Sequence, residues 1–68
     1  MDKGWQRIYF SDKRHLVEIA KAILDENSIE SVVVDKRDSS YVTIGEVELF
    51  VKDDDVILAK ILISQNNL

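Results

Sequence analysis

Residues 46–52 read Glu-Val-Glu-Leu-Phe-Val-Lys, and this stretch decides the fold. Aliphatic residues occupy every second position, at Val47, Leu49 and Val51, and Glu48 and Phe50 lie between them. A period of two is typical of a β-strand that buries one face and leaves the other outside the core. The stretch therefore predicts a strand in a sheet with one covered face.

Four more elements are expected around this strand. Residues 5–10 and 29–35 are rich in aromatic and β-branched residues, which predicts two further strands. Residues 12–26 and 53–64 predict two helices. The first helix has apolar residues at spacings of three and one, and they are Leu16, Ile19, Ala20, Ile23 and Leu24. Residues 65–68 are expected to fray.

The helix ends have signals of their own. Ser11 is expected to be the N-cap of the first helix, because its hydroxyl can accept a free backbone N–H. Asn27 is expected to take the left-handed conformation after that helix. At the second helix, Asp53–Asp55 place carboxylates beside free N–H groups and the positive end of the dipole. A metal site is the weaker interpretation, since consecutive helical residues point about 100° apart.

The element order is therefore β-α-β-β-α, in one domain of residues 1–68. A right-handed crossover makes strands 5–10 and 29–35 parallel, and strand 46–52 then fits between them, antiparallel to both. The expected fold is α+β, a truncated ferredoxin-like two-layer sandwich with a three-stranded sheet and both helices on one face. In the alternative, strand 46–52 lies outside strand 29–35. Residues 41–44 extend a strand or belong to a long connection.

Composition limits the classes of function. With 46% hydrophobic and 32% charged residues, the 68-residue chain has the profile of a globular domain. The absence of cysteine excludes disulfides and thiolate metal sites. A net charge of −4 argues against binding to nucleic acid or to an anionic membrane. No apolar run approaches the roughly 20 residues that span a bilayer, and no signal-peptide stretch is recognisable, so a cytoplasmic location is expected.

Five parts of the sequence together form a family pattern. They are Trp5, the helical residues 16–24, and residues 29–32, 35–41 and 45–51. In these parts, which extend over nearly the whole chain, the sequence resembles a family of short bacterial domains named as prokaryotic signal-transducing proteins. The resemblance implies a ferredoxin-like fold similar to that of the nitrogen-regulatory PII proteins, and it implies no established activity.

No catalytic motif is recognisable in the sequence. It contains no nucleophile elbow, P-loop, zinc-protease or dinucleotide-binding pattern. His15, the single histidine, lies beside the apolar stripe and is expected to be a surface residue. We therefore predict a non-enzymatic binding or regulatory module with no metal and no cofactor. The alternatives are a small enzyme or enzyme subunit with a dispersed site, and a purely structural protein-interaction domain.

Aromatic residues are expected on the helix-free face of the sheet. By alternation, Trp5, Arg7 and Tyr9 share this face with Phe50, while Ile8 and Phe10 face the helices. The rings either cover the sheet or form a surface for a partner. Because a core this small rarely supplies more than about 3–5 kcal/mol of net stability, a homo-oligomer or a protein partner is expected. The contact would use this face or a sheet edge, and a partner chain could supply a fourth strand.

The charges of the first helix run against its dipole. Lys13 and Arg14 lie in the first turn, and Asp25 and Glu26 lie in the last, although the dipole favours the reverse order. Packing of the apolar stripe can tolerate this small cost. Alternatively, the positive charge at the helix start serves to attract an anion.

A candidate site for a small anionic ligand follows from these charges. Ligands of α/β folds bind at the sheet edge where the carboxyl ends of parallel strands meet, and two loops are expected there. Their candidate residues are Ser11, Lys13, Arg14, Lys36, Arg37, Ser39, Ser40 and Tyr41. They would hold a phosphate or carboxylate by charge-assisted hydrogen bonds. In the alternative, Asp35 and Asp38 neutralise Lys36 and Arg37 in a solvated turn.

Overall fold

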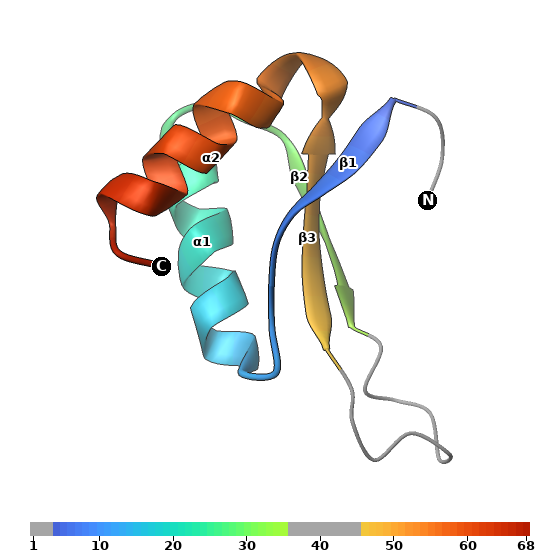
Figure 1. Cartoon of the computed structure of the whole chain (residues 1–68), viewed down its shortest axis with the longest axis vertical. Helices are drawn as coiled ribbons and strands as arrows, with labels where there is room; N and C mark the ends of the chain where they lie inside the picture. Colours follow the sequence, from blue (N-terminus) through green and yellow to red (C-terminus); the bar gives the residue numbers. More distant parts are fainter. Residues whose placement is uncertain (1–3, 36–45) are drawn as a thin grey trace.

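The computed structural model describes residues 4–35 and 46–68. Its elements follow the expected order (Figure 1). They are β1 (Trp5–Ser11), α1 (Arg14–Glu26), β2 (Ser31–Asp35), β3 (Val47–Lys52), the 3-10 turn η1 (Asp53–Asp55) and α2 (Val56–Gln65). The α+β class and the β-α-β-β-α order are thereby confirmed. The expectation for residues 41–44 lies outside the described residues.

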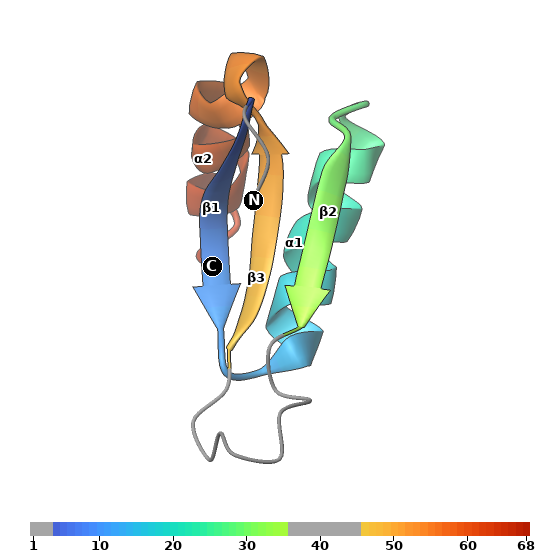
Figure 2. The same ribbon diagram turned by 90° about the vertical axis from the view of Figure 1, so that its right-hand side faces the viewer.

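The strand order in the sheet is β1-β3-β2. β3 is antiparallel to both neighbours, so β1 and β2 run parallel to each other, as Figure 2 shows. This confirms that the strand predicted from residues 46–52 lies in the centre, and it excludes the alternative in which that strand lies outside β2. A central strand pairs with a strand on each side, so its alternation sets which side chains of both neighbours face the core.

Both helices pack on the same face of the sheet, as expected for the two-layer sandwich (Figure 1). The core lies between the two layers. Its buried apolar residues are Val17, Ala20, Leu24, Ile29, Val47, Leu49, Val51, Ala59 and Ile63. The three alternating apolar residues of β3 are fully buried, which confirms the face assigned to them from the sequence.

A β-bulge in β1 changes which side chains face the helices. Arg7 pairs with Phe50, and Tyr9 pairs with Leu49, so Ile8 is an extra residue that has no partner of its own in β3. Residues that pair across antiparallel strands lie on the same face. Tyr9 therefore faces the helices together with the buried Leu49 and packs against the core. The alternation that put Tyr9 on the helix-free face is wrong, because one extra residue reverses the alternation after it.

α1 begins and faces the core differently from the prediction. It starts at Arg14 with Lys13 as the N-cap residue, so the assignment of Ser11 as N-cap is wrong. The Ser11 hydroxyl still accepts a backbone hydrogen bond, from the Lys13 N–H at 3.0 Å. Val17 is fully buried, whereas Ile19 is 47% exposed. The buried side of α1 is therefore centred on Val17, Ala20 and Leu24, and Ile19 lies outside it.

The two helices end with the same backbone motif. After α1, the N–H of Ile29 bonds to the Leu24 carbonyl at 2.9 Å, and Ser28 has a φ of 60°. The left-handed residue is thus Ser28 and not Asn27, whose φ is −103°. After α2, Leu68 bonds to the Ile63 carbonyl at 3.3 Å in the same way. These bonds satisfy carbonyls that would otherwise be free, so residues 65–68 close the helix and do not fray.

Candidate functional site

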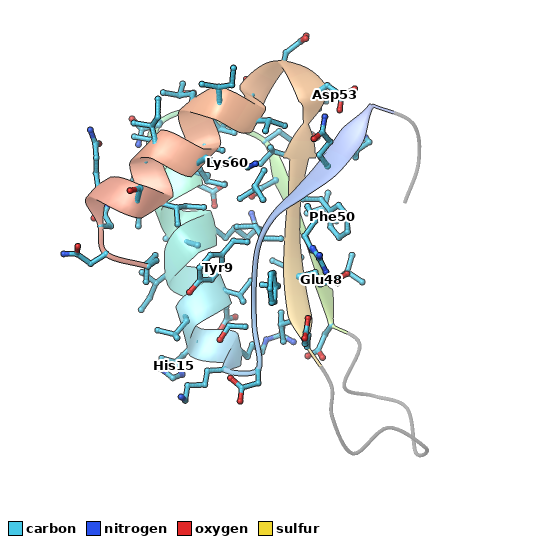
Figure 3. All side chains as sticks on the ribbon, viewed as in Figure 1. Tyr9, His15, Glu48, Phe50, Asp53 and Lys60 are labelled. Atoms are coloured by element: carbon cyan, nitrogen blue, oxygen red, sulfur yellow. The ribbon has the colours of Figure 1, made fainter. Side chains whose placement is uncertain are left out.

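The face of the sheet opposite the helices is the candidate site, and we call it the open face. Cross-strand pairing and alternation assign its residues, which are Trp5, Arg7, Phe10, Val32, Val34, Glu48, Phe50 and Lys52. Figure 3 shows Phe50 and Glu48 pointing away from the helices, whereas Tyr9 points toward them. Phe10 is 51% exposed, and Trp5 and Phe50 are half-buried. Large side chains therefore lie outside the helix-covered core.

An ion pair lies at the centre of the open face. An Arg7 guanidinium N–H donates to Glu48 Oε2 at 2.8 Å across β1 and β3. Glu48 is only 5% exposed, whereas the Arg7 side chain is 46% exposed. A carboxylate removed from water needs a charged partner to offset the loss of hydration. Arg7 provides that partner, and the pair fixes Arg7 over the middle of the sheet.

Two cations lie over aromatic rings of the same face. The Arg7 guanidinium is 4.6 Å from the centroid of the Phe10 ring, and Lys52 Nζ is 5.9 Å from that of Trp5. Lys52 also pairs with Glu30 at 3.1 Å, just before β2. Each cation thus has one carboxylate and one ring as neighbours, and the ring alone attracts an exposed cation by about 0.5–1 kcal/mol. The charges of the open face balance within the chain.

Only part of this face was predicted from the sequence. Trp5, Arg7 and Phe50 lie on it as expected, whereas Tyr9 does not and Phe10 does. Val32, Val34, Glu48 and Lys52 were also not among the expected site residues, and of these Glu48 is a charged residue in the middle of a central strand. That position was a usable signal, because a charge there needs a partner from a neighbouring strand. The bulge that exchanges Tyr9 for Phe10 has no comparable signal in the sequence.

The predicted anion site is only partly within the described residues. Lys36, Arg37, Ser39, Ser40 and Tyr41 lie outside them, as does Asp38. Ser11 ends β1, Lys13 precedes α1 and Arg14 begins it, at the end of the sheet where β2 also ends. Here Arg14 bonds to Asp35 Oδ2 at 2.6 Å, and its Nε lies 3.6 Å from Glu18. The Arg14 charge is therefore already engaged by two carboxylates.

Two shallow pockets lie along β1. One, of about 330 Å³, lies at the start of the strand and is lined by Gly4, Trp5, Lys52, Asp53 and Asp54. The other, of about 360 Å³, adjoins the bulge and is lined by Arg7, Ile8, Tyr9, Phe10 and Lys60. Figure 3 shows Lys60 of α2 beside β1 there. Both pockets share residues with the open face.

The acidic run before α2 forms a hydrogen-bonded turn. Asp53–Asp55 form η1, and Asp53 accepts a hydrogen bond from the Gln6 amide at 2.9 Å, while its N–H bonds to the Gly4 carbonyl. In residues 4–35 and 46–68, no three His, Cys, Asp or Glu side chains group as metal ligands. Through the hydrogen bonds of Asp53, the acidic run that follows β3 is held against the start of β1.

The sequence as a whole matches one family. A family model described as "Putative prokaryotic signal transducing protein" matches residues 5–67, which include every strand and helix described above. The chain belongs to this family. The family description points to signal transduction and specifies no ligand or mechanism. No curated protein and no solved structure matches the chain. None of the described helices is both long and apolar enough to cross a bilayer.

Proposed function

We propose that this chain is a non-enzymatic regulatory module that binds another protein through its open face. The observation that supports this most is the open face itself, where rings and valines surround the Arg7–Glu48 pair on the side away from the helices. A group of large apolar side chains left outside the core is typical of a protein interaction site, and the ion pair at its centre adds a polar contact. The family description agrees with such a role, although a fold alone does not determine function.

The chemistry of the open face indicates the kind of partner. The chain has a net charge of −4, yet the charges of this face are balanced by the Arg7–Glu48 and Lys52–Glu30 pairs. Arg7 has five N–H donors, and its exposed side can bind a second carboxylate. The partner that fits is a protein with an apolar patch and a carboxylate placed to meet Arg7.

Site-specific crosslinking identifies the partner. A photoreactive amino acid at position 10 samples the open face, and the same group at position 57 samples the outer side of α2 as a control. A protein captured at position 10 and not at position 57 is purified and titrated against the purified chain. Capture of a second copy alone at position 10 would replace the proposed partner with self-association.

Matched variants test the purified pair. We expect Phe50→Glu and Arg7→Glu to weaken binding at least about tenfold, because the first puts a charge into the apolar part of the contact and the second reverses the charge that would meet the partner's carboxylate. Ile57→Glu, on the other layer, should leave the Kd unchanged. Equal binding by all variants would contradict the open face as the site. Turnover of any compound in a metabolite screen would contradict the non-enzymatic role and support the enzyme alternative.

A further inference from the structure

Among the residues that the structure describes, the most exposed large aliphatic side chains lie on the outer side of the helix layer. Ile57 is 76% exposed, Leu58 and Ile61 are each 48% exposed, and Ile19 of α1 is 47% exposed. α2 is apolar on nearly every side, since Ala59 and Ile63 are buried against the core while these residues face outward. A helix that is hydrophobic all round is normally covered on all sides.

Two contacts fix how the helices are turned. Arg14 of α1 reaches Asp35 at the β2 side, so the opposite flank of α1, with Ile19, faces α2. Lys60 of α2 lines the pocket at β1, so the opposite flank of α2, with Leu58, faces α1. Ile19 and Leu58 therefore each lie on the flank of their own helix that is turned toward the other helix. We call the exposed large aliphatic residues of the two helices the helix patch: Ile19, Ile57, Leu58 and Ile61.

The outer ridge of α1 has a pattern that is complementary to itself. His15, Ile19, Ala22 and Glu26 are all exposed and follow spacings of four, three and four, which places them in one line along the helix. When two such ridges pack antiparallel, His15 meets Glu26 and Ile19 meets Ala22. A basic group then faces a carboxylate at each end, and a large side chain faces a small one in the middle.

We propose that a second copy of this chain covers the helix patch. The twofold axis lies in the contact plane and runs across the helices, so α1 packs antiparallel on α1 of the second copy, and α2 packs on α2. This arrangement buries the patch on both copies and brings His15 of each copy to Glu26 of the other. It is independent of the open face, which lies on the other side of the molecule (Figure 1).

Within the chain Arg14 is held by Asp35 and Glu18, and the arrangement gives partners to the remaining charges at the two ends of α1. The basic residues at the start of α1 and the carboxylates at its end oppose the helix dipole. Within the described residues, Lys13 and Glu26 form no ion pair of their own. In the antiparallel pair, the basic start of each α1 lies over the acidic end of the other. The reversed charge order then favours association and fixes the direction of packing.

Sedimentation equilibrium of the full chain tests the contact. We expect a dimer at about 50 µM, a concentration suited to micromolar affinity. Ile61→Glu should give a monomer, and Leu58→Lys should do the same. Phe10→Glu is the matched control, because it adds the same charge at a similar exposure on the open face and should leave the dimer intact. Circular dichroism verifies that each variant is folded.

Charge exchange tests the direction of packing. His15→Glu puts two carboxylates opposite each other and should weaken the dimer about fivefold, and Glu26→Lys should weaken it less. The double variant forms a Glu–Lys pair and should restore or exceed the wild-type affinity. A wild-type chain that stays monomeric, or an Ile61→Glu variant that still dimerises, would overturn the proposal. Dissociation by Phe10→Glu alone, or a double variant no tighter than the singles, would do so as well.

Discussion

The two faces of the sheet differ in how they are covered, although β3 contributes to both. Val47, Leu49 and Val51 are fully buried under the helices, whereas Glu48 and Phe50 lie on the open face. Fully burying an aliphatic side chain contributes about 1.5–3 kcal/mol. The open face instead has an ion pair, rings and cations, each of smaller net value. The covered face therefore supplies most of the stability, and the open face remains available for binding.

Leu49→Ala, on the covered face, should cause the largest loss of stability. Leu49 has no exposed surface, so its truncation leaves a cavity in the core, and we expect a loss of about 2–5 kcal/mol in the free energy of unfolding. Phe50→Ala, one residue away on the open face, is the control and should cost less than half as much. Urea denaturation followed by circular dichroism measures both. Equal losses would show that the two faces bury their side chains alike.

The Arg7–Glu48 pair should give the next largest effect. Arg7→Ala leaves a nearly buried carboxylate without its guanidinium, which we expect to cost about 2 kcal/mol. A double-mutant cycle with Glu48→Ala should show that the two losses are not additive, because the residues interact directly. Lys52→Ala removes the exposed Glu30 pair and should cost under about 1 kcal/mol. Additive losses in the Arg7–Glu48 cycle would assign the cost to packing alone.

The covered face was largely predictable from the sequence, because burial of one side of an element spaces its apolar residues at regular intervals. The alternation of residues 47–51 identified the strand and its buried face, and the right-handed crossover favoured its place between the other two strands. The facing of α1 was predicted less well: Ile19 was assigned to the core in place of Val17. Helix periodicity gives a stripe about 100° wide, and which residues lie at its centre depends on α2, which the local sequence of α1 does not contain.

The open face was less predictable, since no period is imposed where the side chains are only half-buried. Trp5, Arg7 and Phe50 were placed correctly by counting along the strands. Tyr9 and Phe10 were exchanged, because the count fails after an extra residue. A bulge adds one residue without changing the composition of the strand. Part of the predicted anion site lies in residues 36–41 and stays a prediction there.

Deletion of Ile8 sharpens the comparison at the bulge. In the shortened strand, Arg7 and Tyr9 become neighbours and still point to opposite faces, so Tyr9 should keep its place toward the helices. We expect a loss of about 1–1.5 kcal/mol, because Ile8 is half-buried against the core. Ile8→Ala keeps the extra residue and loses a similar side chain, so the difference between the two variants measures the bulge itself. Nuclear Overhauser effects from the Tyr9 ring to the open face would contradict the expected facing.

The smallest losses of stability should come from Val→Thr substitutions on the two faces of β2. Val33 pairs with Leu49 on the covered face, and its neighbour Val32 pairs with Phe50 on the open face. Thr has nearly the shape of Val but adds a hydroxyl, which costs about 1–3 kcal/mol when it is buried without a hydrogen bond. Because Val33 is only partly buried, we expect Val33→Thr to cost about 1 kcal/mol.

Val32→Thr should cost under about 0.5 kcal/mol, because the hydroxyl of a strand residue on the open face can reach water. Both substitutions replace a Val by a Thr at adjacent positions of the same strand, so their effects on strand propensity are equal. The difference between the two losses of stability therefore reports how completely each face is covered. Thermal unfolding of both variants under identical conditions measures that difference. If Val32→Thr costs as much as Val33→Thr, the open face is covered as completely as the helix face, and a surface so covered would not be free to bind the proposed partner.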